Sequence, residues 1–120
     1  MTEPEYAEQI TSRCESLGTW REEFASTRTR LAKIYVRIDV VEAEYERTGA
    51  HPIVTHTNKA GAKNAARNPF LVELDTLYDQ ALTYERELGL TPAALRKINE
   101  DALKPRRRNG LEQALRLLEG

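Results

Sequence analysis

A seven-residue repeat of apolar side chains in the first half of the chain constrains the fold more than any other feature. Two sets of positions, offset by three residues, recur along this stretch: Ile10, Leu17, Phe24, Leu31, Ile38 and Tyr45, and Trp20, Thr27, Ile34 and Val41. Such a pattern is typical of helices that pack side by side along an apolar seam. It predicts one long, coiled-coil-like helical arm over residues 1–49, kinked near Gly18, that needs a partner helix to cover its seam.

The remainder of the chain is predicted to be a basic connector followed by shorter helices. Residues 50–68 have no apolar period, so we expect an extended connector. Asn68 and Pro69 are typical of a helix start, and residues 69–104 are expected to hold a second amphipathic helix and a short one. Residues 105–120 would form a basic tail. Because no convincing strand alternation is found, the predicted fold class is all-α, in one domain.

Length and composition narrow the class of protein. A chain of 120 residues fits one domain, and its single cysteine, Cys14, excludes a disulfide framework. The first residues are acidic and include no apolar stretch, and no apolar run approaches the ~18 residues of a membrane span. We therefore expect a soluble cytoplasmic protein with no membrane partner.

Charge is segregated along the chain, although the net charge is only −1. Residues 1–50 carry a net charge of −3 and residues 69–92 a net charge of −4, whereas residues 51–68 and 93–120 each carry +3. Clustered cations can contact DNA phosphates, which gives affinity without sequence choice. The candidate DNA-binding residues are Lys59, Lys63, Arg67, Arg106, Arg107 and Arg108. A solvated linker, or a surface that docks a protein partner, is the alternative interpretation of these clusters.

Between the connector and the short helix, the residues resemble a known family. The segment Asn68-Pro69-Phe70-Leu71-Val72-Glu73-Leu74, then a helix, then Leu88-Gly89-Leu90-Thr91-Pro92-Ala93-Ala94-Leu95-Arg96, is similar to the small subunit of bacteriophage terminases. The resemblance covers roughly residues 20–98 and includes the polar lead-in at 57–61. It does not extend to the tail after Leu103.

The resemblance implies a non-catalytic packaging protein without cofactor, metal or catalytic residues. Its partners would be other copies of itself in a ring, double-stranded viral DNA, and the terminase large subunit, whose ATPase and nuclease it would regulate in the host cytoplasm. Apolar surface left over from packing within the chain would form the ring contacts. The candidate oligomer-interface residues are Trp20, Phe24, Leu31, Ile34, Tyr35, Ile38, Leu71 and Tyr78.

Two rival interpretations stay open. Residues 81–98 have the apolar spacing of a helix-turn-helix whose Arg96 and Lys97 would face a major groove, although Glu85 occupies a position that needs a small residue. A helical adaptor, similar to an antitoxin, that binds a protein and no DNA is the alternative function. An enzyme or a zinc site is not expected, because the two histidines lack further ligands and no phosphate-binding glycine loop is present.

Overall fold

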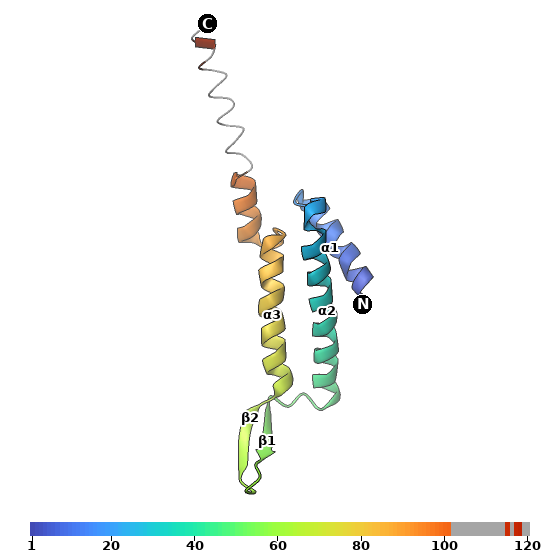
Figure 1. Ribbon diagram of the computed structural model, residues 1–120, viewed down its shortest axis with the longest axis vertical. Coiled ribbons are helices and arrows are strands. Elements are labelled where there is room, and N and C mark those ends of the chain that lie inside the picture. The colour runs from blue at the N-terminus through green and yellow to red at the C-terminus, as the bar shows by residue number, and fades with distance from the viewer. Residues whose placement is uncertain (102–114, 116, 119–120) are drawn as a thin grey trace.

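The computed structural model describes residues 1–101, 115, 117 and 118, and it is mostly helical with one small sheet. Helices α2 and α3 lie side by side, α1 packs against α2, and the two strands extend beyond one end of the helices (Figure 1). The chain is helical again from 92 to 101. In chain order the elements are α1 (Glu3–Leu17), a 3-10 turn (Glu22–Phe24), α2 (Ala25–Arg47), β1 (Ile53–Thr57), β2 (Lys63–Arg67) and α3 (Pro69–Glu87).

Local signals set both ends of α1. The hydroxyl of Thr2 accepts a hydrogen bond from the Glu5 amide at 3.3 Å, and the Glu5 carboxylate accepts one from the Thr2 amide at 3.4 Å. This reciprocal capping satisfies amide groups that have no partner inside the helix. Gly18 ends α1 with a φ of +73°, a conformation that side chains disfavour. The chain changes direction at this glycine.

The prediction of one long arm is wrong, because α1 folds back along α2. Tyr6, near the start of α1, donates a hydrogen bond of 2.5 Å to Asp39, late in α2. The rings of Tyr6 and Tyr35 lie 5.3 Å apart. The apolar repeat continues across the turn because both helices bury a stripe in the same core, to which Ile10 and Leu31 belong. The repeat therefore cannot distinguish a rod from two antiparallel helices.

Helices of the same chain cover much of the apolar seam, although Leu17 stays 42% exposed. Its buried residues form one cluster between α1, α2 and α3, and Leu31 and Cys14 are completely excluded from solvent. The cluster consists of Ile10, Cys14, Leu31, Ala32, Ile34, Leu77, Ala81 and Leu88. The partner that the seam requires is thus supplied within the subunit, and assembly of several subunits stays a prediction.

The segment 50–68 contains an antiparallel β-hairpin, which corrects both the all-α prediction and the expected extended connector. Ile53 pairs with Arg67 at its base, and Thr57 pairs with Lys63 near its turn. In the turn, the side-chain oxygen of Asn58 accepts hydrogen bonds from two backbone amides, at 3.0 and 2.9 Å. The run of β-branched residues at 53–55 favours a strand, a signal that a search for helical periods does not register.

Asn68 joins the hairpin to α3 and confirms the predicted helix start. Its side-chain oxygen accepts a hydrogen bond from the Phe70 amide at 2.9 Å, and its side-chain nitrogen donates to the carbonyl of His51 at 2.7 Å. The Asn68 amide itself donates to the Pro52 carbonyl at 2.8 Å, and the residue is buried. One side chain therefore caps the helix and closes the base of the hairpin.

Beyond α3 a turn at Gly89 leads into the helical stretch at 92–101, which extends past the end of α3 in roughly the same direction (Figure 1). Gly89 has a φ of +70°, and a Cβ atom at this position would lie 2.7 Å from the Cδ1 atom of Ile98. The turn therefore favours glycine for its backbone conformation, since the end of the exposed Ile98 side chain can shift. Within the described residues, no helix combines the length and apolar character needed to cross a membrane.

Candidate nucleic-acid interface

The β-hairpin forms a positively charged projection. Lys59 lies in the turn, and Lys63 and Arg67 lie four residues apart on β2, so their side chains share one face of the hairpin. All three residues are exposed, and residues 51–68 contain no acidic side chain. No carboxylate in the described part of the chain forms an ion pair with Lys59 or Lys63. Both lysines are therefore available to an anionic partner.

Arg67 differs from the two lysines because it already has a partner. Its guanidinium lies 2.8 Å from the Asp75 carboxylate of α3, and about half of each side chain is exposed. The pair connects the base of the hairpin to the helix, and such exposed pairs contribute little stability. Of the three cations predicted for this segment, Arg67 is thus the one least available to DNA.

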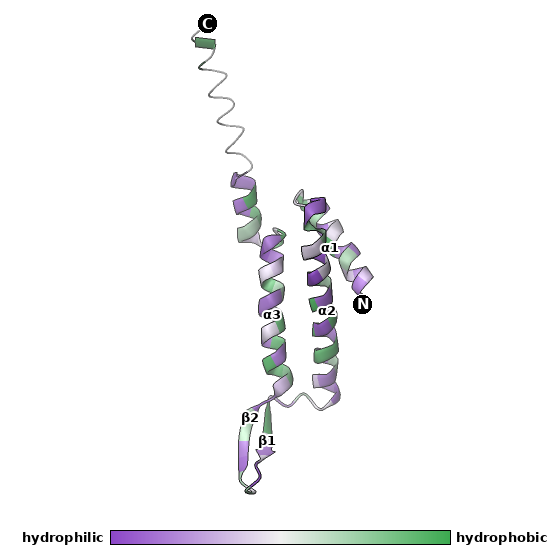
Figure 2. Ribbon diagram, viewed as in Figure 1, coloured by the Kyte–Doolittle hydropathy of each residue, from purple (hydrophilic) through white to green (hydrophobic). Residues whose placement is uncertain are grey.

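The hairpin has no core of its own. Val54 and Ala66 are half-buried, and the other residues of both strands are exposed. Ile53 is 58% exposed, and the start of β1 is coloured as hydrophobic in Figure 2 although the strand extends away from the helices. A two-stranded sheet of this kind gains little stability from burying apolar side chains. Its contribution to the molecule is to hold side chains away from the helices.

A second basic cluster, on α2, was not predicted. Arg30, Lys33 and Arg37 are exposed and lie on one side of this helix, where they border a groove of about 300 Å³ with Gln80 and Tyr84 of α3. We name these three cations the α2 basic row. The sequence does contain the signal, because residues 24–38 include no acidic residue. The net charge of −3 over residues 1–50 concealed this local cluster of cations.

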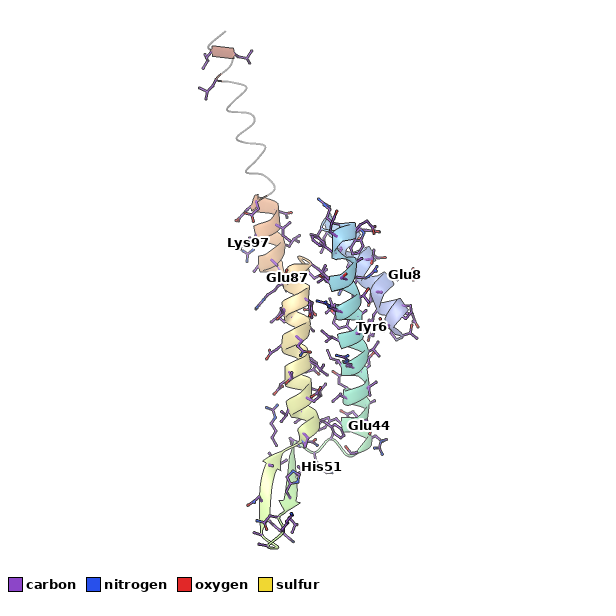
Figure 3. All side chains as sticks on the ribbon, in the orientation of Figure 1. Tyr6, Glu8, Glu44, His51, Glu87 and Lys97 are labelled. Atoms are coloured by element: carbon purple, nitrogen blue, oxygen red, sulfur yellow. The ribbon has the colours of Figure 1, made fainter. Side chains whose placement is uncertain are left out.

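Other predicted cations lie far from the hairpin or outside the described residues. Figure 3 shows His51 beside the start of β1 and Lys97 beyond the opposite end of α3. Arg96 and Lys97 are exposed on the short helix at 92–101. Both residues that the helix-turn-helix interpretation assigns to the DNA major groove are therefore accessible. The cluster 106–108 falls among residues that are not described.

The predicted oligomer-interface residues separate into buried and accessible groups. Leu31 and Ile34 are buried inside the subunit, where a neighbouring chain cannot reach them. Tyr78 is 45% exposed, and Leu71 is half-buried beside it in an open groove. The others are partly buried and pack against the subunit's own core: Trp20, Phe24, Tyr35 and Ile38.

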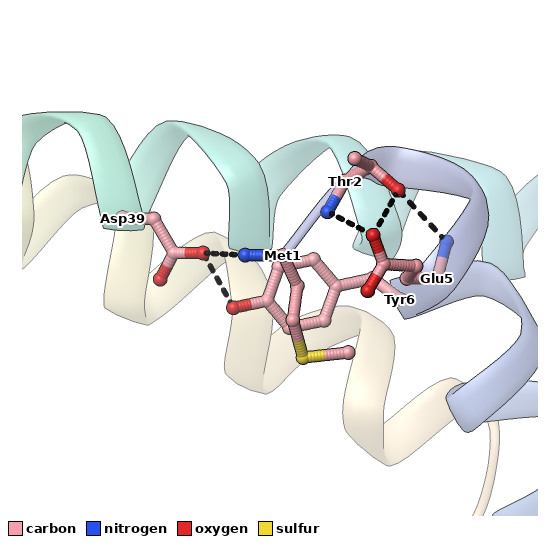
Figure 4. A network of polar contacts seen from close by, with 5 residues as sticks. All are labelled: Met1, Thr2, Glu5, Tyr6 and Asp39. Carbon is pink, nitrogen blue, oxygen red and sulfur yellow. Dashed lines mark hydrogen bonds and ion pairs between the residues drawn. The ribbon is translucent and has the colours of Figure 1, made fainter.

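Tyrosine–carboxylate hydrogen bonds connect the helices. Asp39 accepts from Tyr6 and also lies 3.7 Å from the amino group of Met1 (Figure 4). The hydrogen bond to Asp39 raises the pKa of Tyr6 to about 12. Burial, and then a 2.8 Å hydrogen bond to Glu85, raise the pKa of Tyr35. These tyrosines stay protonated near neutral pH and hold helices together.

The described residues contain no group of three His, Cys, Asp or Glu side chains arranged to hold a metal ion. Burial raises the pKa of the Cys14 thiol, and Cys14 belongs to the apolar core. A buried neutral thiol is a poor nucleophile, so we interpret Cys14 as a packing residue.

Comparisons with known proteins give one match. Searches of curated proteins and of solved structures found no match to the chain. The family model described as phage terminase, small subunit, matches residues 5–104. This range includes all but the first two residues of α1, all of α2, the hairpin and α3, and the helical stretch at 92–101. The chain belongs to the phage terminase small-subunit family.

Proposed function

We propose that this terminase small subunit is a non-catalytic protein that assembles into a ring and contacts double-stranded viral DNA through its β-hairpin. In the host cytoplasm it would regulate the ATPase and nuclease of the terminase large subunit. Membership of the family supports a role in phage DNA packaging. The observation that carries the DNA contact is the projecting hairpin, which holds Lys59 and Lys63 exposed and without acidic neighbours in its own segment.

Assembly would compensate for the weak charge of one subunit. With a net charge of −1, the chain has no overall attraction for DNA. Closed symmetry would repeat each hairpin around a ring, so a weak contact per subunit becomes several contacts on one duplex. Binding should then weaken steeply with salt and show little base preference, because phosphate contacts carry no sequence information.

A salt titration of DNA affinity tests the hairpin. Lys59→Gln with Lys63→Gln should lower the affinity and flatten the plot of log affinity against log salt by about 0.9 for each phosphate that the variant no longer neutralises. Arg96→Gln with Lys97→Gln is the matched control at the other end of the molecule and should leave the slope unchanged. If the control abolishes binding and the hairpin variant retains it, the helix-turn-helix interpretation is correct.

The assembly and regulatory parts have separate tests. Light scattering of the wild-type protein at tens of micromolar should give a mass of more than four subunits, whereas a helical adaptor would stop at two to four chains.

The subunit alone should hydrolyse no ATP, and its addition should change the ATPase and nuclease rates of its cognate large subunit. Arg106→Gln, Arg107→Gln and Arg108→Gln together test whether the tail contributes to DNA affinity or to that regulation.

A further inference from the structure

Two charged surfaces of opposite sign lie on opposite sides of α2. With 3.6 residues per turn, the α2 basic row and the acidic residues Asp39, Glu42 and Glu46 lie about 180° apart around the helix axis. Helix α3 packs against α2 between them, and residues of α3 line a groove on each side. Each subunit therefore has a positive side and a negative side.

The negative side is an open groove with an apolar floor. It has a volume of about 440 Å³, and Leu71, Leu74 and Tyr78 of α3 line it together with the three acidic residues. We name it the acidic groove. Helix α1 does not cover it fully, because α1 begins at Glu3 and its residue Tyr6 already lies at the level of Asp39. The last turns of α2 are thus left open on this side.

The carboxylates of the acidic groove have few positive neighbours. No lysine or arginine in the described part of the chain forms an ion pair with Asp39, Glu42 or Glu46. Asp39 lies near the amino group of Met1, and Glu42 accepts a hydrogen bond from Tyr78 at 2.5 Å. Such a groove repels DNA, but it suits arginine and lysine side chains, whose methylene stems pack on apolar surface and whose charged groups reach a carboxylate rim.

The α2 basic row has the matching properties. Arg30, Lys33 and Arg37 are exposed, and no described carboxylate lies within ion-pair distance of them. Three cations on one side of α2 thus correspond to three carboxylates on the other. On the proposed function that this protein forms a ring, we infer that subunits join head to tail, with the α2 basic row of one chain docked on the acidic groove of the next.

Symmetry supports a ring over a two-fold dimer for this contact. A two-fold axis brings the same patch of both subunits together, whereas these two surfaces lie on opposite sides of one chain. A head-to-tail contact uses both surfaces on every subunit and closes only as a ring. Lys33 and Glu42 are nine residues apart, or about 13 Å along the helix. To bring Lys33 of one subunit level with Glu42 of the next, α2 must be inclined to the ring axis.

Charge exchange provides the test. Lys33→Glu with Arg37→Glu makes the row negative, and Glu42→Lys with Glu46→Lys makes the groove positive. Each variant alone should be monomeric by light scattering, because each places like charges at every contact. One chain carrying all four substitutions should recover an assembly of more than four subunits. Arg96→Glu with Lys97→Glu is the matched control and should retain the wild-type mass.

The outcomes separate this inference from the proposed function. Circular dichroism should show wild-type helix content in every variant, since the substituted residues are exposed. If wild-type protein assembles and both two-site variants keep its mass, the inference is overturned while the ring stands. If the row variant keeps its mass but loses DNA affinity, the row is a DNA surface and the inference is again overturned. A monomeric wild-type protein would overturn the ring itself.

Discussion

The helical core and the β-hairpin of this protein are stabilised in different ways. The core excludes Leu31 and its neighbours from water between three helices, whereas the hairpin leaves most of both strands exposed. Backbone pairing and two asparagine side chains, Asn58 and Asn68, maintain the hairpin. Substitutions in the core should therefore change folding, and substitutions in the hairpin should change binding.

Leu31→Ala should have the largest effect on stability. Leu31 is completely buried, and removing its side chain leaves a cavity among the helices. We expect the free energy of unfolding, measured by urea titration, to fall by about 2–5 kcal/mol. Ile53→Ala, at a 58% exposed position of the hairpin, is the control and should change it by less than about 0.5 kcal/mol. Equal losses in the two variants would mean that the hairpin is as well packed as the core.

Asn68→Ala should affect both regions at once. The substitution removes the cap of α3 and leaves the His51 carbonyl without its side-chain donor. We expect a loss of about 1–2 kcal/mol in unfolding free energy, together with weaker DNA binding, although no charge changes. Asn58→Ala at the exposed turn should alter the turn alone. If Asn68→Ala leaves the DNA affinity unchanged, the hydrogen bonds of Asn68 are not needed to orient the hairpin for DNA binding.

Tyr6→Phe should cause a smaller loss that depends on pH. The Asp39 side chain is 41% exposed, so solvent screens the bond. Because the folded-state pKa of Tyr6 is raised to about 12, the bond stabilises the protein fully below pH 10 and is lost as pH rises through 12. The difference in unfolding free energy between wild type and variant should therefore shrink between pH 8 and pH 12. A difference that is constant with pH would argue against the Tyr6–Asp39 hydrogen bond.

Arg67→Gln should have the smallest effect on stability. The Arg67–Asp75 pair is half exposed on both sides, so its loss should change the unfolding free energy by less than about 0.5 kcal/mol. Its effect on DNA affinity should also be smaller than that of Lys63→Gln, because Lys63 has no carboxylate partner among the described residues. A larger effect of Arg67 on affinity would reverse the ranking of the two cations.

Local signals in the sequence were sufficient where one side chain decides the structure. Asn68 and Pro69 start α3 where expected, and Gly18 and Gly89 end helices with left-handed backbone. The direction of the chain after Gly18 could not be predicted, because an apolar seven-residue repeat fits a continuous helix and two antiparallel helices equally well. It depends on contacts between distant residues such as Tyr6 and Asp39.

The candidate site was predictable in composition but not in shape. The acid-free segment at 51–68 identifies its three cations, Lys59, Lys63 and Arg67, as candidates. Their positions in space depend on whether the segment is helical, extended or a β-hairpin, and the sequence did not reveal the hairpin. The α2 basic row was missed because acidic residues elsewhere in residues 1–50 masked it in the segment sum. The acidic groove requires α2 and α3 to be brought side by side, which depends on their packing.

Crosslinking from the hairpin tip tests the central claim most directly. Ala60→Cys places an exposed thiol beside Lys59 for a photoactivatable label, and the buried Cys14 should not react. Thr83→Cys, at an exposed position on α3, is the matched control. If the hairpin contacts DNA, the label at residue 60 should crosslink to duplex DNA at low salt and the label at residue 83 should not. Crosslinking from residue 83 with none from residue 60 would contradict this account.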